Sequence, residues 1–79
     1  MNLRQVFASN VRRLRAENKL SQEALADEVG MDRSYLSTVE TSATNIGLDL
    51  LEKIAGALGV EPADLLKKPS KSAGGRSKR

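Results

Sequence analysis

The sequence predicts an all-α domain built from five short helices. Apolar residues recur at helical spacing up to about residue 66, and most of them are Leu, Val, Ile or Ala; Phe7 and Tyr35 are the two aromatic residues. Residues that begin or end helices, namely Ser, Asp, Pro and Gly, separate these apolar runs. A chain of 79 residues allows one small domain. The core of such a domain gives little stability, so association with a partner subunit is expected to help stabilise it.

The first two helices are indicated by an apolar stripe and by boundary residues. Between Leu3 and Lys19, four residues share one helix face: Leu3, Phe7, Val11 and Leu14. Ser21 is a good N-cap for the second helix, whose inner face would hold Leu25, Ala26 and Val29. We expect Gly30 to end this helix, because glycine adopts the positive φ of a helix C-terminus without strain.

The third helix is expected from Arg33 to about Thr41, with Asp32 as its N-cap. Its inward positions are Leu36 and Val39, with Glu40 as a further candidate. Residues 42–47 are small and mostly polar, which predicts a loop.

Two more helices and a tail complete the predicted organisation. The fourth helix runs from about Leu48 to Leu58, ends at Gly59, and buries five apolar residues: Leu48, Leu51, Ile54, Ala55 and Leu58. Glu61 and Pro62 open a short fifth helix through Leu66, with proline at the first helical position. The domain is therefore expected to span residues 1–66, and residues 67–79 to form a disordered basic tail.

The net charge of +3 combines two parts of opposite sign. Residues 1–66 contain seven Lys or Arg and ten Asp or Glu, whereas residues 67–79 contain six Lys or Arg and no acid. Affinity for a polyanion must therefore come from local patches or from the tail. The tail adds nonspecific DNA affinity in one interpretation and is only a solubilising end in the other.

Missing residue types exclude several classes of site. The chain has no Cys and no His, which excludes disulfides, thiolate chemistry, most zinc sites and the usual general base. We expect no metal, no cofactor and no enzyme activity, since no nucleophile–base pair and no phosphate-cradling glycine loop is present. The chain has no apolar run long enough to span a membrane and no signal peptide, so we expect a cytoplasmic protein with no membrane partner.

The second and third helices together fit a helix-turn-helix over Gln22 to Thr41. Such a motif needs a small residue where the helices approach and a turn residue that tolerates positive φ, and Ala26 and Gly30 meet these needs. The seam between the helices would hold apolar side chains: Leu25, Val29, Met31, Leu36 and Val39. The second helix of such a motif enters the DNA major groove with its leading side chains near base edges.

The leading face of the third helix supplies the candidates for base readout. Arg33 stands in the first turn, where a guanidinium can contact guanine O6 and N7; the alternatives are a phosphate contact or a solvated charge. Three hydroxyl residues share the exposed side of this helix: Ser34, Ser37 and Thr38. They can bond bases or phosphates, or simply face solvent.

Three segments carry a family resemblance: residues 20–30 (LSQEALADEVG), 35–40 (YLSTVE) and 48–60 (LDLLEKIAGALGV). In order and spacing they resemble the lambda-repressor/Cro-like, XRE-type helix-turn-helix family over about residues 3–66. Residues 32–37 (DRSYLS) are most similar to the recognition helix of controller proteins from restriction–modification systems. The resemblance implies a controller-like or repressor-like transcriptional regulator that binds double-stranded operator DNA. Residues 41–47 depart from the family pattern, because they lack its usual basic residue.

The resemblance also implies roles for individual residues. It makes Gln22, Tyr35 and Asn45 candidates for contacts to the DNA backbone, although the Tyr35 ring could instead pack on the domain surface. Gln22 would also prop the third helix; its alternative is the ordinary polarity of a helix start. The resemblance further implies a structural ion pair between Arg15, late in the first helix, and Glu40, at the end of the third. Three other bases, on or after the first helix, are expected to be solvated charges, with an approach to the DNA backbone as the alternative for one of them: Arg12, Arg13 and Lys19.

A single small motif reads only a few base pairs, so useful specificity needs two half-sites and a homodimer. Without a second domain, the interface must come from the fourth and fifth helices, with four candidate residues: Leu50, Val60, Ala63 and Leu66. The alternative of another class is an antitoxin-type or protein-interaction module that uses the same fold, with a partner that the sequence does not identify.

Overall fold

The computed structural model describes residues 2–41 and 45–68, and its regular structure over those residues is helical. Four α-helices follow along the chain: α1 (Leu3–Glu17), α2 (Gln22–Val29), α3 (Arg33–Glu40) and α4 (Leu48–Leu58). A 3₁₀ helix, η1 (Pro62–Leu66), occupies the position of the expected fifth helix. The predicted all-α class is confirmed, while most of the predicted tail, residues 69–79, lies outside the described residues.

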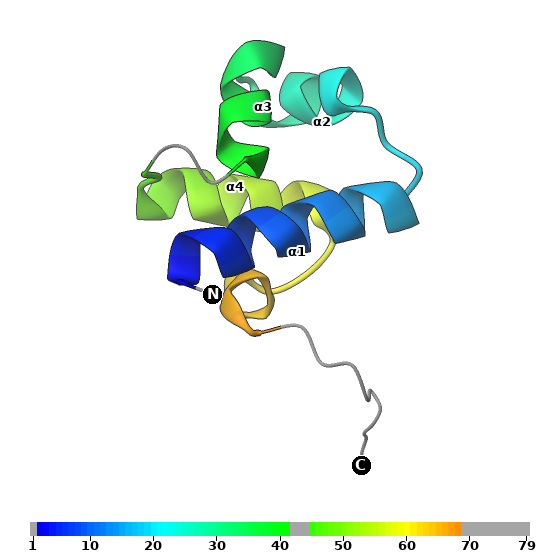
Figure 1. Ribbon diagram of the computed structural model, residues 1–79. Helices are drawn as coiled ribbons and strands as arrows, with labels where there is room; N and C mark the ends of the chain where they lie inside the picture. Colours follow the sequence, from blue (N-terminus) through cyan, green and yellow to red (C-terminus); the bar gives the residue numbers. More distant parts are fainter. Residues whose placement is uncertain (1, 42–44, 69–79) are drawn as a thin grey trace.

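The helices are arranged around α1 and α4, which cross the middle of the molecule (Figure 1). The pair α2 and α3 lies on one side of them and η1 on the other (Figure 1). α2 packs against α3 and α4, while α1 packs against α3, α4 and η1. The described chain therefore ends on the side of the domain opposite α2 and α3.

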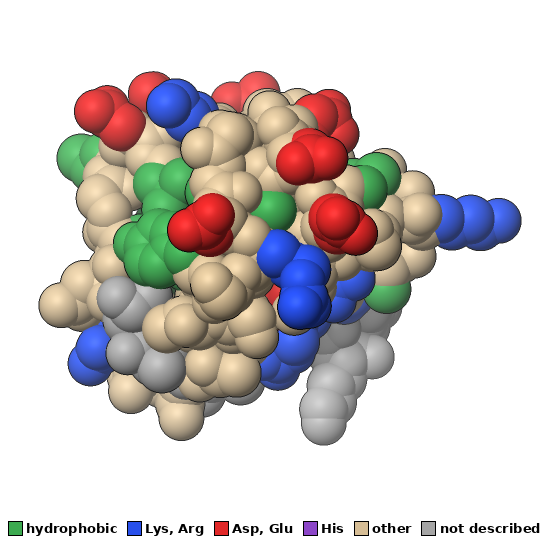
Figure 2. Space-filling model, turned by 90° about the horizontal axis from the view of Figure 1, so that it is seen from above, with side chains coloured by type: hydrophobic (Ala, Val, Ile, Leu, Met, Phe, Trp, Pro, Cys, Tyr) green, Lys and Arg blue, Asp and Glu red, His purple; other side chains and the backbone are tan. Residues whose placement is uncertain are grey.

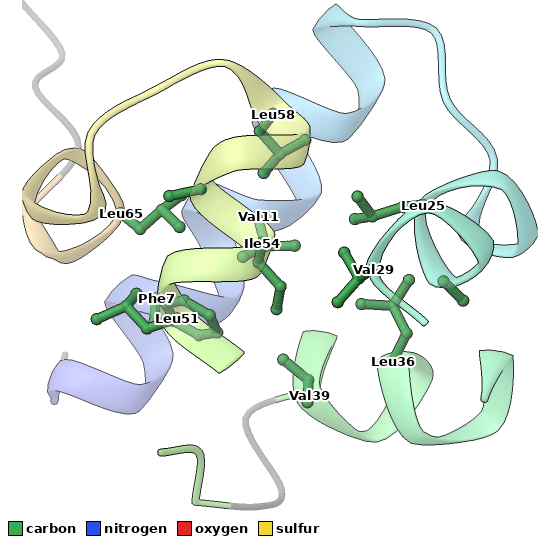
Figure 3. Close-up of a cluster of buried hydrophobic side chains, with 12 residues drawn as sticks. Phe7, Val11, Leu25, Val29, Leu36, Val39, Leu51, Ile54, Leu58 and Leu65 are labelled. Carbon is green, nitrogen blue, oxygen red and sulfur yellow. The ribbon is translucent and has the colours of Figure 1, made fainter. Parts of the chain in front are cut away.

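One apolar core joins all five helical segments (Figure 3). Leu25, Leu36 and Ile54, from α2, α3 and α4, are fully buried, and Val11 and Leu65 add contacts from α1 and η1. The other residues expected at the α2–α3 seam belong to this cluster or pack against it: Val29, Val39 and Met31. Burying each aliphatic side chain stabilises the fold by about 1.5–3 kcal/mol, so the shared cluster fixes how the helices pack.

Two leucines that we expected in the core are exposed instead. Leu3 begins α1 and Leu48 begins α4, and their exposed fractions are 59% and 77%. Helical spacing identifies the inward face of a helix, but it does not reveal how far along that face the neighbouring elements extend. Both residues have the predicted spacing, yet they project past the packed region at the helix ends.

The starts of α1 and α2 carry side-chain caps, whereas the start of α3 does not. The hydroxyl of Ser21 accepts a hydrogen bond from the backbone N–H of Ala24 at 3.0 Å, as an N-cap does. Asn2 and Gln5 form a reciprocal capping box at the start of α1, which sequence reasoning missed. Asp32 occupies the N-cap position of α3, but its side chain makes no capping hydrogen bond, which corrects the expected role.

The ends of the helices are set by residues with positive φ. Gly30 ends α2 at a φ of 82°, and Gly59 ends α4 at a φ of 74°, as the sequence predicts. α1 ends at Glu17, two residues before the expected boundary, because Lys19 adopts a φ of 58° that no α-helix accommodates.

Asn10 is a fully buried polar residue that sequence reasoning did not single out. Its Nδ2 donates to the backbone carbonyls of Leu65 and Lys67, at 2.8 Å each. Its Oδ1 accepts a hydrogen bond from Arg13 Nη2 at 3.2 Å. Because a buried amide is costly unless its polar atoms are paired, these bonds explain why Asn10 is tolerated in the core, and they fasten η1 to α1.

Substitution of glycine by alanine should have opposite effects on stability at Gly30, in the left-handed turn after α2, and at Gly56, inside α4. A Cβ at Gly30 or at Gly56 would meet no atom within 4 Å, so steric crowding is absent at both positions. Gly30→Ala should lower the free energy of unfolding by about 1–2 kcal/mol because of its positive φ. Gly56→Ala, inside α4, should raise it by about 0.5–1 kcal/mol. Urea unfolding measures both variants, and equal effects would contradict this explanation.

Candidate nucleic-acid interface

The turn between α2 and α3 is closed by backbone hydrogen bonds. The N–H groups of Gly30 and Met31 both donate to the carbonyl of Ala26, at 2.8 and 2.9 Å. Ala26 itself is buried, with 2% of its surface exposed. The small side chain and the left-handed glycine therefore hold the two helices in one mutual orientation.

The carboxylate of Glu40 connects three helices. Glu40 ends α3 and is only 2% exposed, and its Oε2 lies 2.7 Å from Nε of Arg15 on α1. Its Oε1 accepts from Nη2 of Arg15 at 3.1 Å and from Nε2 of Gln22, at the start of α2, at 3.0 Å. A buried carboxylate must be paired and hydrogen-bonded, and here the donors come from both neighbouring helices.

Two further arginine contacts extend this network. Nη1 of Arg15 donates to the carbonyl of Leu20 at 2.9 Å, which ties the chain between α1 and α2. Nη1 of Arg12 donates to the backbone carbonyl of Glu40, so the expectation of a purely solvated Arg12 was wrong. The local sequence pattern could not indicate this contact, because the carbonyl lies 28 residues away in the sequence.

The bond from Gln22 to Glu40 was also missed by sequence reasoning. The resemblance implies that Gln22 props the third helix as well as contacting the DNA backbone, but it does not identify the partner; the side chain is half-buried and bonds Glu40. The predicted Arg15–Glu40 pair could have indicated this bond. A buried carboxylate can accept more hydrogen bonds than one arginine donates, so a further donor from a neighbouring helix is expected.

The leading residues of α3 point away from the core. Arg33 and Ser34 are exposed, and Tyr35 is 39% exposed. Ser37 and Thr38 are half-buried. The hydroxyl of Thr38 donates to the carbonyl of Ser34 at 3.0 Å, so its hydrogen is used inside the helix and its oxygen remains as an acceptor.

The start of α2 and the start of α3 meet at a shallow surface hollow. Five residues line it: Arg15, Ser21, Gln22, Glu23 and Arg33. The guanidinium of Arg15 is already paired with Glu40, so Arg33 and the hydrogen-bonding groups of the helix start are what the hollow offers to an anion. Glu23 opposes that attraction, so a partner must approach from the arginine side.

The surface around α2 and α3 is not uniformly basic. Figure 2 views this side of the molecule and shows acidic side chains spread over it, with basic side chains among them. Three of the acids stand on the exposed side of α2: Glu23, Asp27 and Glu28. Attraction to DNA from this side therefore depends on a few placed groups rather than on net charge.

The other predicted site residues lie elsewhere. Asn45 is exposed in the segment before α4, and it lines an apolar hollow with Ile46 and Leu48. Of the four candidates for a dimer interface, three are half-buried and pack against the core: Leu50, Val60 and Leu66. Ala63 is exposed on η1.

Residues 2–41 and 45–68 contain no group of three or more His, Cys, Asp or Glu that could hold a metal ion. Over the same ranges, no helix has the length and apolar character needed to cross a bilayer.

Comparison with known proteins gives consistent matches. The family profile described as helix-turn-helix matches residues 11–65. The control protein C.BamHI of Bacillus amyloliquefaciens is 46% identical over 66 residues, which are 82% of this chain and 82% of that protein.

Solved structures agree with the sequence matches. The hypothetical transcription factor NHTF from Neisseria superposes with a TM-score of 0.83 at 47% identity, over 86% of this chain and 78% of that one. The restriction–modification controller protein C.Esp1396I, solved as a tetramer with its natural 35 base-pair operator, gives a TM-score of 0.74 at 28% identity, over 82% of this chain and 86% of that one.

The Glu40 network predicts unequal effects of one substitution at two ion pairs. Glu40→Gln removes the charge that balances Arg15, whose side chain is 20% exposed, and should lower the free energy of unfolding by about 2–3 kcal/mol. Glu17→Gln breaks an exposed pair with Arg13 and should change it by at most about 1 kcal/mol. Chemical denaturation measures the free energy of unfolding of both variants. If both substitutions lowered it by a similar small amount, the Glu40 network would not stabilise the packing of the helices.

Proposed function

The chain belongs to the helix-turn-helix family, and from this premise we propose that it is a sequence-specific transcriptional regulator that binds a two-fold DNA operator as a homodimer. One observation carries the proposal: α3 buries Leu36 and Val39 in the core while Arg33 and Ser34 at its leading end stay exposed. A helix held this way can enter the major groove with its first turn near base edges. The relative C.BamHI is named a control protein, which supports regulation of the controller type.

Arg33 carries the main base contact in this proposal. Its side chain is exposed and makes no ion pair with any described residue, so its guanidinium is available to guanine O6 and N7. Ser34 and Ser37 follow on the same helix and can contact neighbouring bases or phosphates. Thr38 contributes as an acceptor or through its methyl group, because its hydrogen is held by the Ser34 carbonyl.

The start of α2 supplies the main contact to the DNA backbone. The amide of Gln22 has two hydrogens, and one of them is directed to Glu40. The second hydrogen and the backbone N–H groups of the first turn can donate to a phosphate. Glu40 thus orients the amide that meets the phosphate. Tyr35 and Asn45 are the further candidates for backbone contacts.

The two-fold operator follows from the size of the motif. One α3 reads only a few base pairs, so two copies at half-sites one helical turn apart are needed for useful specificity. Among the relatives, C.Esp1396I was solved as a tetramer on its operator, which supports binding by more than one copy.

The proposed role of Arg33 is tested by selecting bound duplexes from a random DNA pool. The wild-type protein should select a two-fold site with one preferred guanine per half-site that depends on Arg33. Arg33→Ala should lose that preference and bind the selected site more weakly by about 1–3 kcal/mol per lost contact.

Lys53→Ala is the matched control, because it removes the same positive charge from the exposed surface of α4, outside the proposed DNA contacts. This variant should keep the base preference. If Arg33→Ala selected the same sequences as wild type, the assignment of Arg33 would be wrong. If the wild-type protein showed no sequence preference at any salt concentration, the proposed function itself would fail.

A further inference from the structure

The turn that ends α1 holds a lysine in a backbone conformation that usually belongs to glycine. Lys19 has a φ of 58°, and the other described residues with positive φ are Gly30 and Gly59. A residue with a side chain is strained in this region, because its Cβ crowds the following carbonyl oxygen. Strained residues that the fold holds in place are found most often at functional sites, so Lys19 is a candidate for a functional role.

The same turn ends three helices, and the other two use glycine. After α1, the N–H of Lys19 donates to the carbonyl of Ala16 at 3.0 Å, and the following N–H donates one residue further back, also at 3.0 Å. Gly30 after α2 and Gly59 after α4 have the same pair of hydrogen bonds. Glycine is the commonest residue in this pattern, so a glycine at position 19 would form the same turn with less strain. The backbone therefore does not explain why a lysine stands here.

The charge of Lys19 is available to a partner outside the domain. Lys19 is exposed and forms no ion pair with any described residue. It is one of the three bases for which the sequence leaves an approach to the DNA backbone open. The other two have partners in the domain, since Arg12 donates to a backbone carbonyl of α3 and Arg13 pairs with Glu17. Lys19 is therefore the best placed of the three for an external contact.

The turn that carries Lys19 is fastened beside the proposed contact at the start of α2. Nη1 of Arg15 donates to the carbonyl of Leu20 at 2.9 Å, and the same guanidinium binds Glu40. Ser21, two residues after Lys19, lines the hollow between the starts of α2 and α3. Two residues span at most about 7 Å, and a lysine side chain is long, so its ammonium can reach a phosphate beside this hollow. In Figure 1 the segment that joins α1 to α2 runs along the edge of the molecule up to the start of α2.

We propose that Lys19 makes a further contact to the DNA backbone, at a phosphate next to the one proposed for the start of α2; the inference rests on the proposed function. An ammonium acts on a phosphate as a point charge, so a long side chain on a fixed turn suffices for the contact. The contact also brings a positive charge to a region where Glu23 repels the same partner. The lysine thus lowers the stability of the turn and raises the affinity for DNA.

Lys19→Gly tests the proposal, because it should change stability and DNA affinity in opposite directions. The variant should raise the midpoint of urea unfolding, since glycine adopts positive φ without strain. It should also weaken binding to the duplex selected from the random pool. The slope of log K against log salt concentration should fall in magnitude by about 0.9 for each lost phosphate contact. Fluorescence anisotropy at several salt concentrations measures the affinity and the slope.

A second duplex of shuffled sequence separates a phosphate contact from a base contact. A phosphate carries no sequence information, so Lys19→Gly should weaken binding to both duplexes by a similar factor and keep the base preference. A loss of base preference in this variant would contradict a contact to the backbone.

Two further variants serve as controls. Lys19→Arg keeps the charge at the same position and should bind with the wild-type salt slope. Lys53→Ala removes the same charge from the exposed surface of α4 and should also keep the wild-type slope. A wild-type slope in Lys19→Gly would overturn the proposal, as would an equal loss of slope in Lys53→Ala, which would reduce the effect to net charge.

Failure of the proposed function would look different. If the function holds but Lys19 makes no contact, Lys19→Gly binds like wild type while Arg33→Ala still loses its preferred guanine. A wild-type protein without any sequence preference would contradict the proposed function. In that case the salt slope of Lys19→Gly on the shuffled duplex would still decide whether Lys19 contacts a phosphate.

Discussion

The position of α3 depends on one buried carboxylate. Glu40 stands at the end of α3 with almost none of its surface exposed, and its oxygens receive hydrogen bonds from Arg15 on α1 and Gln22 on α2. Because a buried charge is tolerated only when such partners are in place, the three helices cannot shift independently. A pair of this kind contributes orientation more surely than net stability. The same network that fixes α3 also holds the amide of Gln22 at the start of α2, so it couples the position of the proposed base contacts to that of the proposed backbone contact.

The electrostatics of the domain explain why that coupling matters. α2 carries acids on its exposed side, and the residues up to 66 are acidic in sum, so long-range attraction to DNA is weak. The affinity that residues up to 66 contribute must then come from short-range contacts, for which the groups around Arg33 and Gln22 are the proposed source. Such contacts require accurate placement, and the two copies of the proposed homodimer would double them without any added basic surface.

Most of the fold could be predicted because its signals are local. Ser21, Gly30 and Gly59 mark helix boundaries through hydrogen bonds and φ angles that involve neighbouring residues. Partners distant in sequence could not be predicted from local pattern: Asn10 bonds to carbonyls 55 and 57 residues away, and Arg12 to one 28 residues away. The exposure of Leu48 was missed for a similar reason, since spacing gives the face of a helix but not the reach of its neighbours.

The orientation of α3 toward DNA can be measured most directly by mapping amide chemical shifts in the NMR spectrum during titration with an operator duplex. We predict that the largest changes fall on residues 33–38 of α3 and on Gln22, while Asn10 and Leu65, on the opposite side of the core, keep their shifts. Changes concentrated on α1 and η1, with α3 unaffected, would contradict the proposed interface.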